Sequence, residues 1–101
     1  MSSIELVDCH THTVFSDGAS TLEENMEAAL GAGITTIACT DHWGKPDFID
    51  YSIKAKELSR YLSSVAELRN KYPSLEIVSG LEADWYSGCG ADLRTLRADF
   101  D

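Results

Sequence analysis

The sequence lacks any apolar run near the roughly 20 residues that a membrane-spanning helix requires. Its first residues, MSSIELVD, have neither a basic start nor a long apolar stretch, so we expect no secretory signal and a cytoplasmic location. Basic residues are also scarce: 8 Lys and Arg stand against 17 Asp and Glu, which gives a formal net charge of −9. Nucleic acid is bound through clustered Lys and Arg, so we do not expect it as a partner, although bound divalent cations would offset part of this charge.

Cysteine is sparse and has no metal-type spacing. Cys9, Cys39 and Cys89 are an odd number without a C-x-x-C pair, which favours buried thiols in a reducing compartment. Cys89, between two glycines, is the one cysteine in a loop-like context and the remaining candidate for a thiolate ligand. With 101 residues the chain is one domain at most.

Short β-branched runs alternate with amphipathic segments along the chain. Ser20 or Thr21 followed by Glu23 or Glu24 predicts a capped helix start, and Pro73 ends a later helix. The expected strands are residues 4–9, 34–40 and 75–81, and the expected helices are residues 21–30, 51–71 and 91–98, with Leu22, Met26, Ala29 and Leu30 on one apolar face of the first helix. Phe100 resembles the start of a fourth strand. This order predicts an α/β fold with a parallel βαβαβα unit and right-handed crossovers.

All three histidines lie where these strands end. His10 and His12 are two residues apart, so on a strand both imidazoles project to the same side, and His42 follows the second strand. Asp17 and Glu82 place carboxylates at the same edge, which is where parallel α/β folds form active sites. Five candidate ligands exceed the three that one catalytic zinc takes, so the set predicts a site for two or more divalent ions.

Other polar and aromatic residues leave two interpretations open. Asp8 and Asp41 precede the histidines and either orient imidazole N–H groups or act as ordinary solvated or capping carboxylates. The aromatic residues Trp43, Trp85 and Tyr86 either line a substrate pocket or pack. Arg94 and Arg97 fit a solvated helix face better than a phosphate site. No Ser or Cys has the surroundings of a catalytic nucleophile, so the catalytic residues stay unassigned.

Three motifs together resemble a known family. HTHTVFSDG (10–18), TDH (40–42) and GLEAD (80–84) look like the first three motifs of the PHP (polymerase and histidinol phosphatase) superfamily, in the right order. Within it, the SDG ending of the first motif, the long helix before the Glu82 strand and the RADFD ending resemble the histidinol-phosphatase branch.

The resemblance implies the first part of a distorted (β/α)7 barrel and two to three divalent metal ions (Zn, Mn or Fe). His10 and His12 would bind one ion, Glu82 would bridge it to a second, and Asp17 with His42 would serve a third. It further implies hydrolysis of a small phosphate monoester, histidinol phosphate above all, by a metal-bound hydroxide. Later family strands carry further ligands that these 101 residues do not include, so residues 1–101 are expected to be a partial PHP domain. The alternative is a PHP fragment that binds metal or a partner without catalysis, and an open barrel edge would favour self-association.

Overall fold

Strands and helices alternate through the computed structural model, which describes residues 4–44, 51–85 and 87–101. Three strands form a parallel sheet in the order β1-β2-β4, and two short segments, β3 and β5, form a second parallel pair. This confirms the α/β class and the parallel βαβαβα order predicted from the sequence. The elements are β1 (Leu6–Thr11), α1 (Leu22–Gly31), β2 (Ile34–Cys39), β3 (His42–Trp43), α2 (Leu58–Lys71), β4 (Glu76–Ser79), β5 (Glu82–Ala83) and α3 (Cys89–Leu96), with 3-10 turns at Ala55–Glu57 and Arg97–Asp99.

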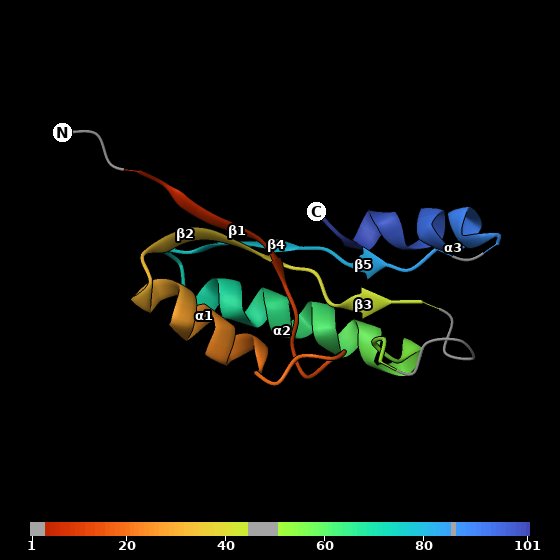
Figure 1. The fold of residues 1–101 in the computed structure, drawn as a ribbon, viewed down its shortest axis with the longest axis horizontal. Helices are drawn as coiled ribbons and strands as arrows, with labels where there is room; N and C mark the ends of the chain where they lie inside the picture. Colours follow the sequence, from red (N-terminus) through yellow and green to blue (C-terminus); the bar gives the residue numbers. More distant parts are fainter. Residues whose placement is uncertain (1–3, 45–50, 86) are drawn as a thin grey trace.

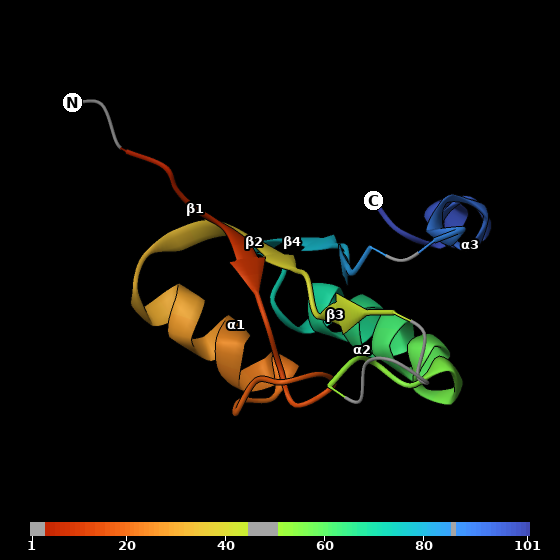
Figure 2. The ribbon, with the colours of Figure 1, turned by 45° about the vertical axis from the view of Figure 1, so that its right-hand side comes forward.

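Helices α1 and α2 lie together on one face of the sheet (Figure 1), whereas α3 lies beyond β5 on the other side (Figure 2). The hydrophobic core fills the layer between the sheet and the α1–α2 pair. Its largest fully buried members come from both helices and from the segment before α2. They are Tyr61, Met26, Ile53 and Val65. Among the described residues, no helix is long and apolar enough to cross a bilayer.

Helix α1 begins as its sequence predicts. The Thr21 side chain accepts a hydrogen bond from the Glu24 backbone N–H at 3.1 Å, and the Glu24 carboxylate accepts one from the Thr21 N–H at 2.9 Å, which completes the capping box. Leu22, Met26 and Ala29 are buried, but Leu30 is 38% exposed, so its assignment to the buried face was wrong.

Strands β2 and β4 are each continued, after an interruption, by a two-residue strand that carries a polar side chain. Cys39 pairs with Ser79, and His42 pairs with Glu82, so both ladders keep the same offset of 40 residues (79 − 39 and 82 − 42). The register therefore survives the interruption and places His42 directly opposite Glu82.

The alternation of side chains also continues through the interruption in the second strand. Ile37, Cys39 and Asp41 are fully buried on the helix side, whereas Thr40 and His42 are partly exposed. Asp41 and His42 are neighbours in the sequence, but they face opposite sides of the sheet.

The two outer strands of the three-stranded sheet, β1 and β4, differ from each other in how their outer edges are covered. Leu6 and Val7 on β1 are about half exposed, at 47% and 51%. Beside β4, the Asp101 backbone N–H donates to the Ser79 carbonyl at 3.1 Å, and the Asp101 carboxylate accepts from the Ser79 N–H at 2.8 Å. The segment at Phe100 is thus extended and bonded to β4, as a further strand would be. Self-association through the open barrel edge stays a prediction.

Candidate metal centre

Three strand ends bring the predicted site residues to one place. His10 lies within β1 and His12 just after it, Asp17 lies in the loop before α1, His42 is on β3 and Glu82 on β5. Parallel strands end at a common edge, so residues up to 72 positions apart in the sequence meet there (10 and 82). All five predicted residues belong to one connected cluster.

The Glu82 carboxylate lies at the centre of the cluster. Its Oε1 is 2.7 Å from His10 Nε2 and 3.0 Å from His12 Nε2, and its Oε2 is 3.0 Å from His42 Nδ1. Asp17 forms a second link, because its two oxygens lie 2.8 Å from His12 Nδ1 and 3.2 Å from His42 Nε2. The three imidazoles are therefore joined to one another by two carboxylates.

Sequence reasoning missed one residue of the cluster. Asp84 Oδ2 lies 3.5 Å from His42 Nδ1, so this carboxylate joins the site from the position directly after β5. The signal was available in the motif GLEAD, since residues 82 and 84 are two apart and side chains two apart on a strand share a face.

These contacts shift the ionisation of two members of the cluster. Partial burial lowers the pKa of His12, but the hydrogen bond to Asp17 and the charges of Asp17 and Glu82 outweigh it and raise the pKa above 6.5. For Asp17, desolvation raises the pKa, whereas the His12 hydrogen bond and the two imidazole charges lower it to below 3.8 overall. Both pKa shifts favour the charged forms of this pair, the His12 imidazolium and the Asp17 carboxylate.

The donor set fits divalent cations. A neutral imidazole has one N–H, yet both ring nitrogens of His12 and of His42 face carboxylate oxygens, so each neutral ring has one contact without a proton. In addition, His42 Nδ1 and Asp84 Oδ2 are buried and make no hydrogen bond within the described residues. Three overlapping groups could each hold an ion: His10–His12–Glu82, His12–Asp17–His42 and His42–Glu82–Asp84.

The loop that carries Asp17 folds tightly on itself. The Ser16 and Gly18 backbone N–H groups both donate to the Thr13 carbonyl, at 3.0 and 2.9 Å. A Cβ on Gly18 would lie 2.7 Å from Thr13 N and 2.8 Å from the His12 carbonyl, so this position needs glycine for its close backbone contact.

Neither acidic residue that precedes a histidine bonds an imidazole ring. Asp8 accepts from the His10 backbone N–H at 3.1 Å. Asp41 is fully buried and accepts from the loop residues Thr13 and Ser16. The two carboxylates therefore bond backbone and loop groups, and they do not orient imidazole N–H groups as one interpretation of the sequence suggested.

The remaining candidates lie outside the cluster. Cys39 is buried as expected, but Cys9 is exposed because its strand is at the edge of the sheet, so burial was wrongly predicted for it. Trp85 is 83% exposed, whereas Tyr86 lies outside the described residues. Arg94 and Arg97 are both exposed, as the solvated-face interpretation predicts.

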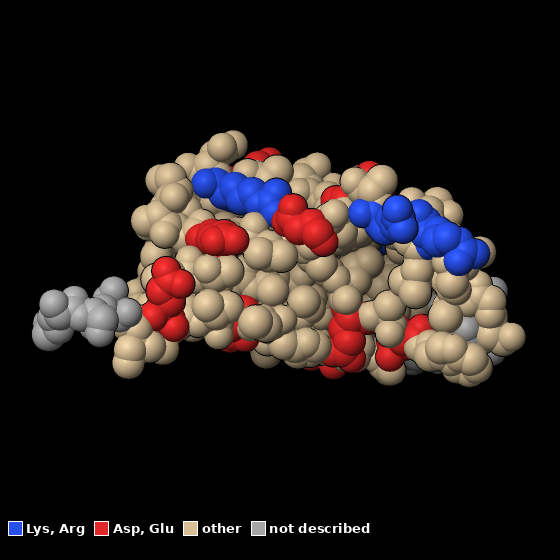
Figure 3. Space-filling view, turned by 90° about the horizontal axis from the view of Figure 1, so that it is seen from above, with Lys and Arg blue, Asp and Glu red and all other residues tan. Residues whose placement is uncertain are grey.

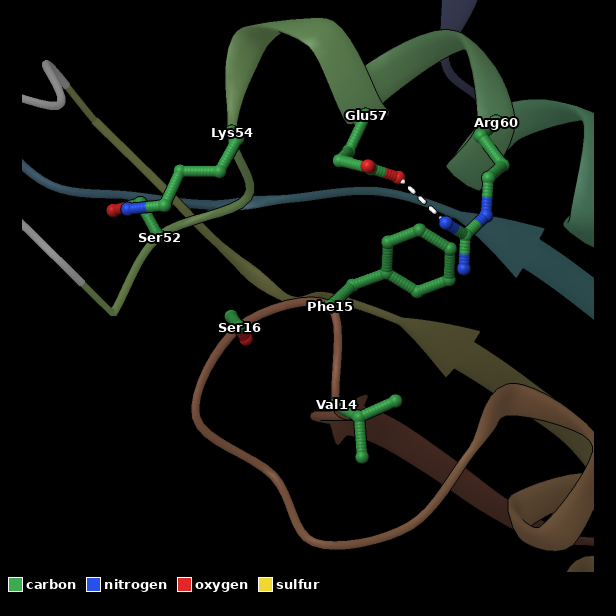
Figure 4. A pocket seen from close by; sticks show the side chains of 7 residues that line it. All are labelled: Val14, Phe15, Ser16, Ser52, Lys54, Glu57 and Arg60. Carbon is green, nitrogen blue, oxygen red and sulfur yellow. Dashed lines mark hydrogen bonds and ion pairs between the residues drawn. The ribbon is translucent and has the colours of Figure 1, made fainter.

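A cavity of about 290 Å³ lies between the loop that carries Asp17 and the segment that leads into α2 (Figure 4). Arg60 pairs with Glu57 at 2.9 Å and lies over the Phe15 ring, 5.2 Å from its centroid. The buried Ser52 hydroxyl lines this cavity and has no hydrogen-bond partner among the described residues. None of the five predicted ligands lines it, and it borders the cluster through Ser16, the neighbour of Asp17.

Comparison with known proteins gives matches over almost the whole chain. The sequence profile of the PHP domain matches residues 8–98. A Deinococcus radiodurans protein named "Probable histidinol-phosphatase" is 30% identical over 100 residues, which are 95% of this chain and 38% of that protein. The DNA polymerase/3'-5' exonuclease PolX of Bacillus subtilis is 29% identical over 89 residues, 81% of this chain and 15% of PolX.

A solved structure is also similar. A Listeria monocytogenes protein described as a "putative histidinol phosphatase" superimposes with a TM-score of 0.80 at 22% identity, over 94% of this chain and 42% of that one. The chain thus spans less than half the length of the relatives it matches.

Proposed function

Because the chain belongs to the PHP domain family, we propose that it carries part of the centre of a metal-dependent phosphoesterase that hydrolyses a small phosphate monoester. Histidinol phosphate is the favoured substrate, since two of the similar proteins are designated histidinol phosphatases. The observation that carries the proposal is the meeting of three histidines and three carboxylates, at 2.7–3.5 Å, where parallel strands end.

Each residue of the cluster has a place in this proposal. His10, His12, Asp17, His42 and Glu82 would hold two to three divalent ions, with Asp84 as a sixth ligand. When bound, such ions supply Lewis-acid stabilisation of phosphoryl oxygens and a low pKa for a coordinated water. The protein's own task is to hold the imidazoles in place, and Glu82, with an oxygen toward each histidine, is suited to join adjacent ions.

The charge distribution favours a small substrate over a nucleic acid. On the face shown in Figure 3, basic side chains lie in two separate groups along one long edge, and acidic side chains form separate small patches on a surface made mostly of other residues. A protein that binds nucleic acid through its phosphates needs clustered Lys and Arg, which the net charge of −9 does not favour. A cytoplasmic location remains part of the proposal.

Metal analysis and phosphate release test this function together. The purified 101-residue chain, dialysed against Zn²⁺ or Mn²⁺, should retain bound metal and release phosphate from histidinol phosphate, whereas His42→Ala should release no phosphate and should lose the ions of the two groups that contain His42. A chain that binds no metal under replete conditions contradicts the proposal.

The second candidate, a PHP chain that binds metal or a partner without catalysis, is favoured by the share of the relatives' length that the chain spans. Bound metal without phosphate release would support it. Hydrolysis of single-stranded DNA in place of histidinol phosphate would instead point to the polymerase-associated relatives.

A further inference from the structure

Asp41 is a buried carboxylate whose three hydrogen bonds all come from one loop. It accepts from the Thr13 backbone N–H at 2.5 Å, from the Thr13 hydroxyl at 2.9 Å and from the Ser16 hydroxyl at 2.6 Å. The Ser16 oxygen in turn accepts from the His42 backbone N–H at 3.2 Å. Charge-assisted bonds of this length are among the stronger ones in proteins, so Asp41 ties the loop between β1 and α1 firmly to the end of β2.

The members of this network are the direct neighbours of three candidate ligands. Thr13 follows His12, Ser16 precedes Asp17, and Asp41 precedes His42. Neighbouring Cα atoms are about 3.8 Å apart across a rigid peptide unit, so a shift of an anchor residue moves the adjacent ligand with it.

The same three ligands form one of the candidate groups, His12–Asp17–His42. The other members of the cluster are positioned differently. His10 lies within β1, and Glu82 is held by the β5 ladder, where its backbone N–H donates to the Asp41 carbonyl at 2.9 Å. No side-chain bond of the Asp41 carboxylate reaches the neighbours of His10, Glu82 or Asp84 within the described residues.

We propose that Asp41 is a positioning residue for one ion of the centre, the ion held by His12, Asp17 and His42. Through Thr13 and Ser16 its carboxylate sets the distance between the loop ligands and His42. This inference rests on the proposed function, because it assumes that the cluster binds metal. It predicts that loss of the network weakens this ion more than the ions that share only His12 or only His42, whereas a purely structural role would weaken all ions equally, together with the fold.

The chain offers a matched pair of substitutions to test this. Ser16→Ala removes a hydroxyl that donates to Asp41, and Ser79→Ala removes a buried hydroxyl that donates to Asp101 at 3.1 Å. Both changes delete the same kind of bond, but only Ser16 belongs to the Asp41 network. Asp41→Asn is the direct variant, and Thr13→Val, which keeps the side-chain shape, covers the case in which Asp41→Asn does not fold.

Calorimetric titration of the metal-free 101-residue chain with Zn²⁺ gives the number of ions and the affinity of each. We expect Asp41→Asn, Ser16→Ala and Thr13→Val to lower the affinity for one ion by about 10–100-fold, as loss of an outer partner of a ligand commonly does. The ions of the other two groups, which share His12 or His42, should weaken by less, and Ser79→Ala should change none. In the metal-free protein, the ring ¹⁵N shifts of His12 and His42 should move in these variants, whereas those of His10 should not.

Two results overturn the inference alone: wild-type affinities for every ion in the variants, or parallel weakening of all ions in proportion to lost thermal stability. A wild-type chain that binds no Zn²⁺ overturns the proposed function and this inference with it.

Discussion

Glu82 offers the sharpest test of the cluster as a metal centre, because it contacts all three histidines and belongs to two of the three candidate groups. Glu82→Gln keeps the shape of the side chain but removes its charge and replaces one ligand oxygen with an NH₂ group. We therefore expect a variant that folds but gains much less stability from metal.

The magnitude follows from linkage between binding and folding. A ligand present at 100 times its Kd stabilises the folded state by about 2.7 kcal/mol. For a domain near 100 residues, about 1 kcal/mol shifts the Tm by about 4–8 °C, so wild-type protein should gain roughly 10–20 °C. Loss of a direct ligand should cost at least the 10–100-fold that an outer partner contributes. The same metal concentration then corresponds to about 1–10 times Kd and a gain of about 0.4–1.4 kcal/mol, or roughly 2–11 °C.

Thermal unfolding followed by circular dichroism, with excess EDTA or with Zn²⁺, measures this difference directly. Glu76→Gln is the matched control, since Glu76 is an exposed glutamate on the adjacent strand β4 and lies outside the cluster. It should keep the wild-type gain. The reasoning is refuted if Glu82→Gln keeps the full gain, if Glu76→Gln loses it, or if wild-type Tm does not respond to metal.

Three further predictions concern other parts of the structure. Asp84→Asn should lower the affinity for Zn²⁺ by about 10-fold or more in calorimetric titration, since this carboxylate lies 3.5 Å from His42 Nδ1; an unchanged affinity would remove it from the site. Gly18→Ala should destabilise the chain by about 1–3 kcal/mol in urea unfolding, because a Cβ there would lie 2.7 Å from Thr13 N, and a neutral result would contradict the close contact. Hydrogen bonding from the Ser79 backbone lowers the pKa of Asp101 below its usual 3.8, so this group contributes stability that is present above pH 3.8 and is lost as the pH falls through the lowered pKa. Asp101→Asn should therefore be less stable than wild type at pH 6, and the difference should narrow below pH 3.8; a constant difference would argue against it.

Much of the fold could be predicted because local patterns and tertiary packing agree in this chain. The capping box at Thr21 and the apolar spacing of Leu22, Met26 and Ala29 depend only on residues within one or two helical turns. Leu30 shows the limit of such reasoning. Its spacing fits the apolar face, but its burial depends on how far the sheet extends beneath the helix, which the local pattern does not contain.

The interruptions in the strands were not predictable from residue type. Residues 34–40 and 75–81 each look like one continuous strand, yet β2 ends at Cys39 and β4 at Ser79, and the ladder resumes at His42 and Glu82. The position of each interruption depends on hydrogen bonds between neighbouring strands, which the residues of one strand do not specify.

For the candidate centre, the sequence predicted five residues, the three histidines and two carboxylates that lie at or after the ends of strands. Asp84 was not predicted, although it lies two residues after Glu82 and side chains at that spacing on an extended chain share a face. The role of Asp41 could not be assigned, because it depends on a loop that folds back over the strand end and brings Thr13 and Ser16 to a carboxylate 25–28 positions away. The available signal in the sequence was the position of Asp41, which follows Ile37 and Cys39 at every second residue and so shares their face of the strand.

The offset of 40 residues between the two inner ladders has a consequence for insertions and deletions. Between β3 and β4 the chain can gain or lose residues in its connecting loops without changing which side chains meet, since only the loop lengths differ. Between Ser79 and Glu82 it cannot. One residue added or removed there would turn Glu82 to the helix side of the sheet and place a neighbour opposite His42. We therefore expect insertions in the loops between β3 and β4 to leave the His42–Glu82 pairing intact, and insertions between Ser79 and Glu82 to abolish it.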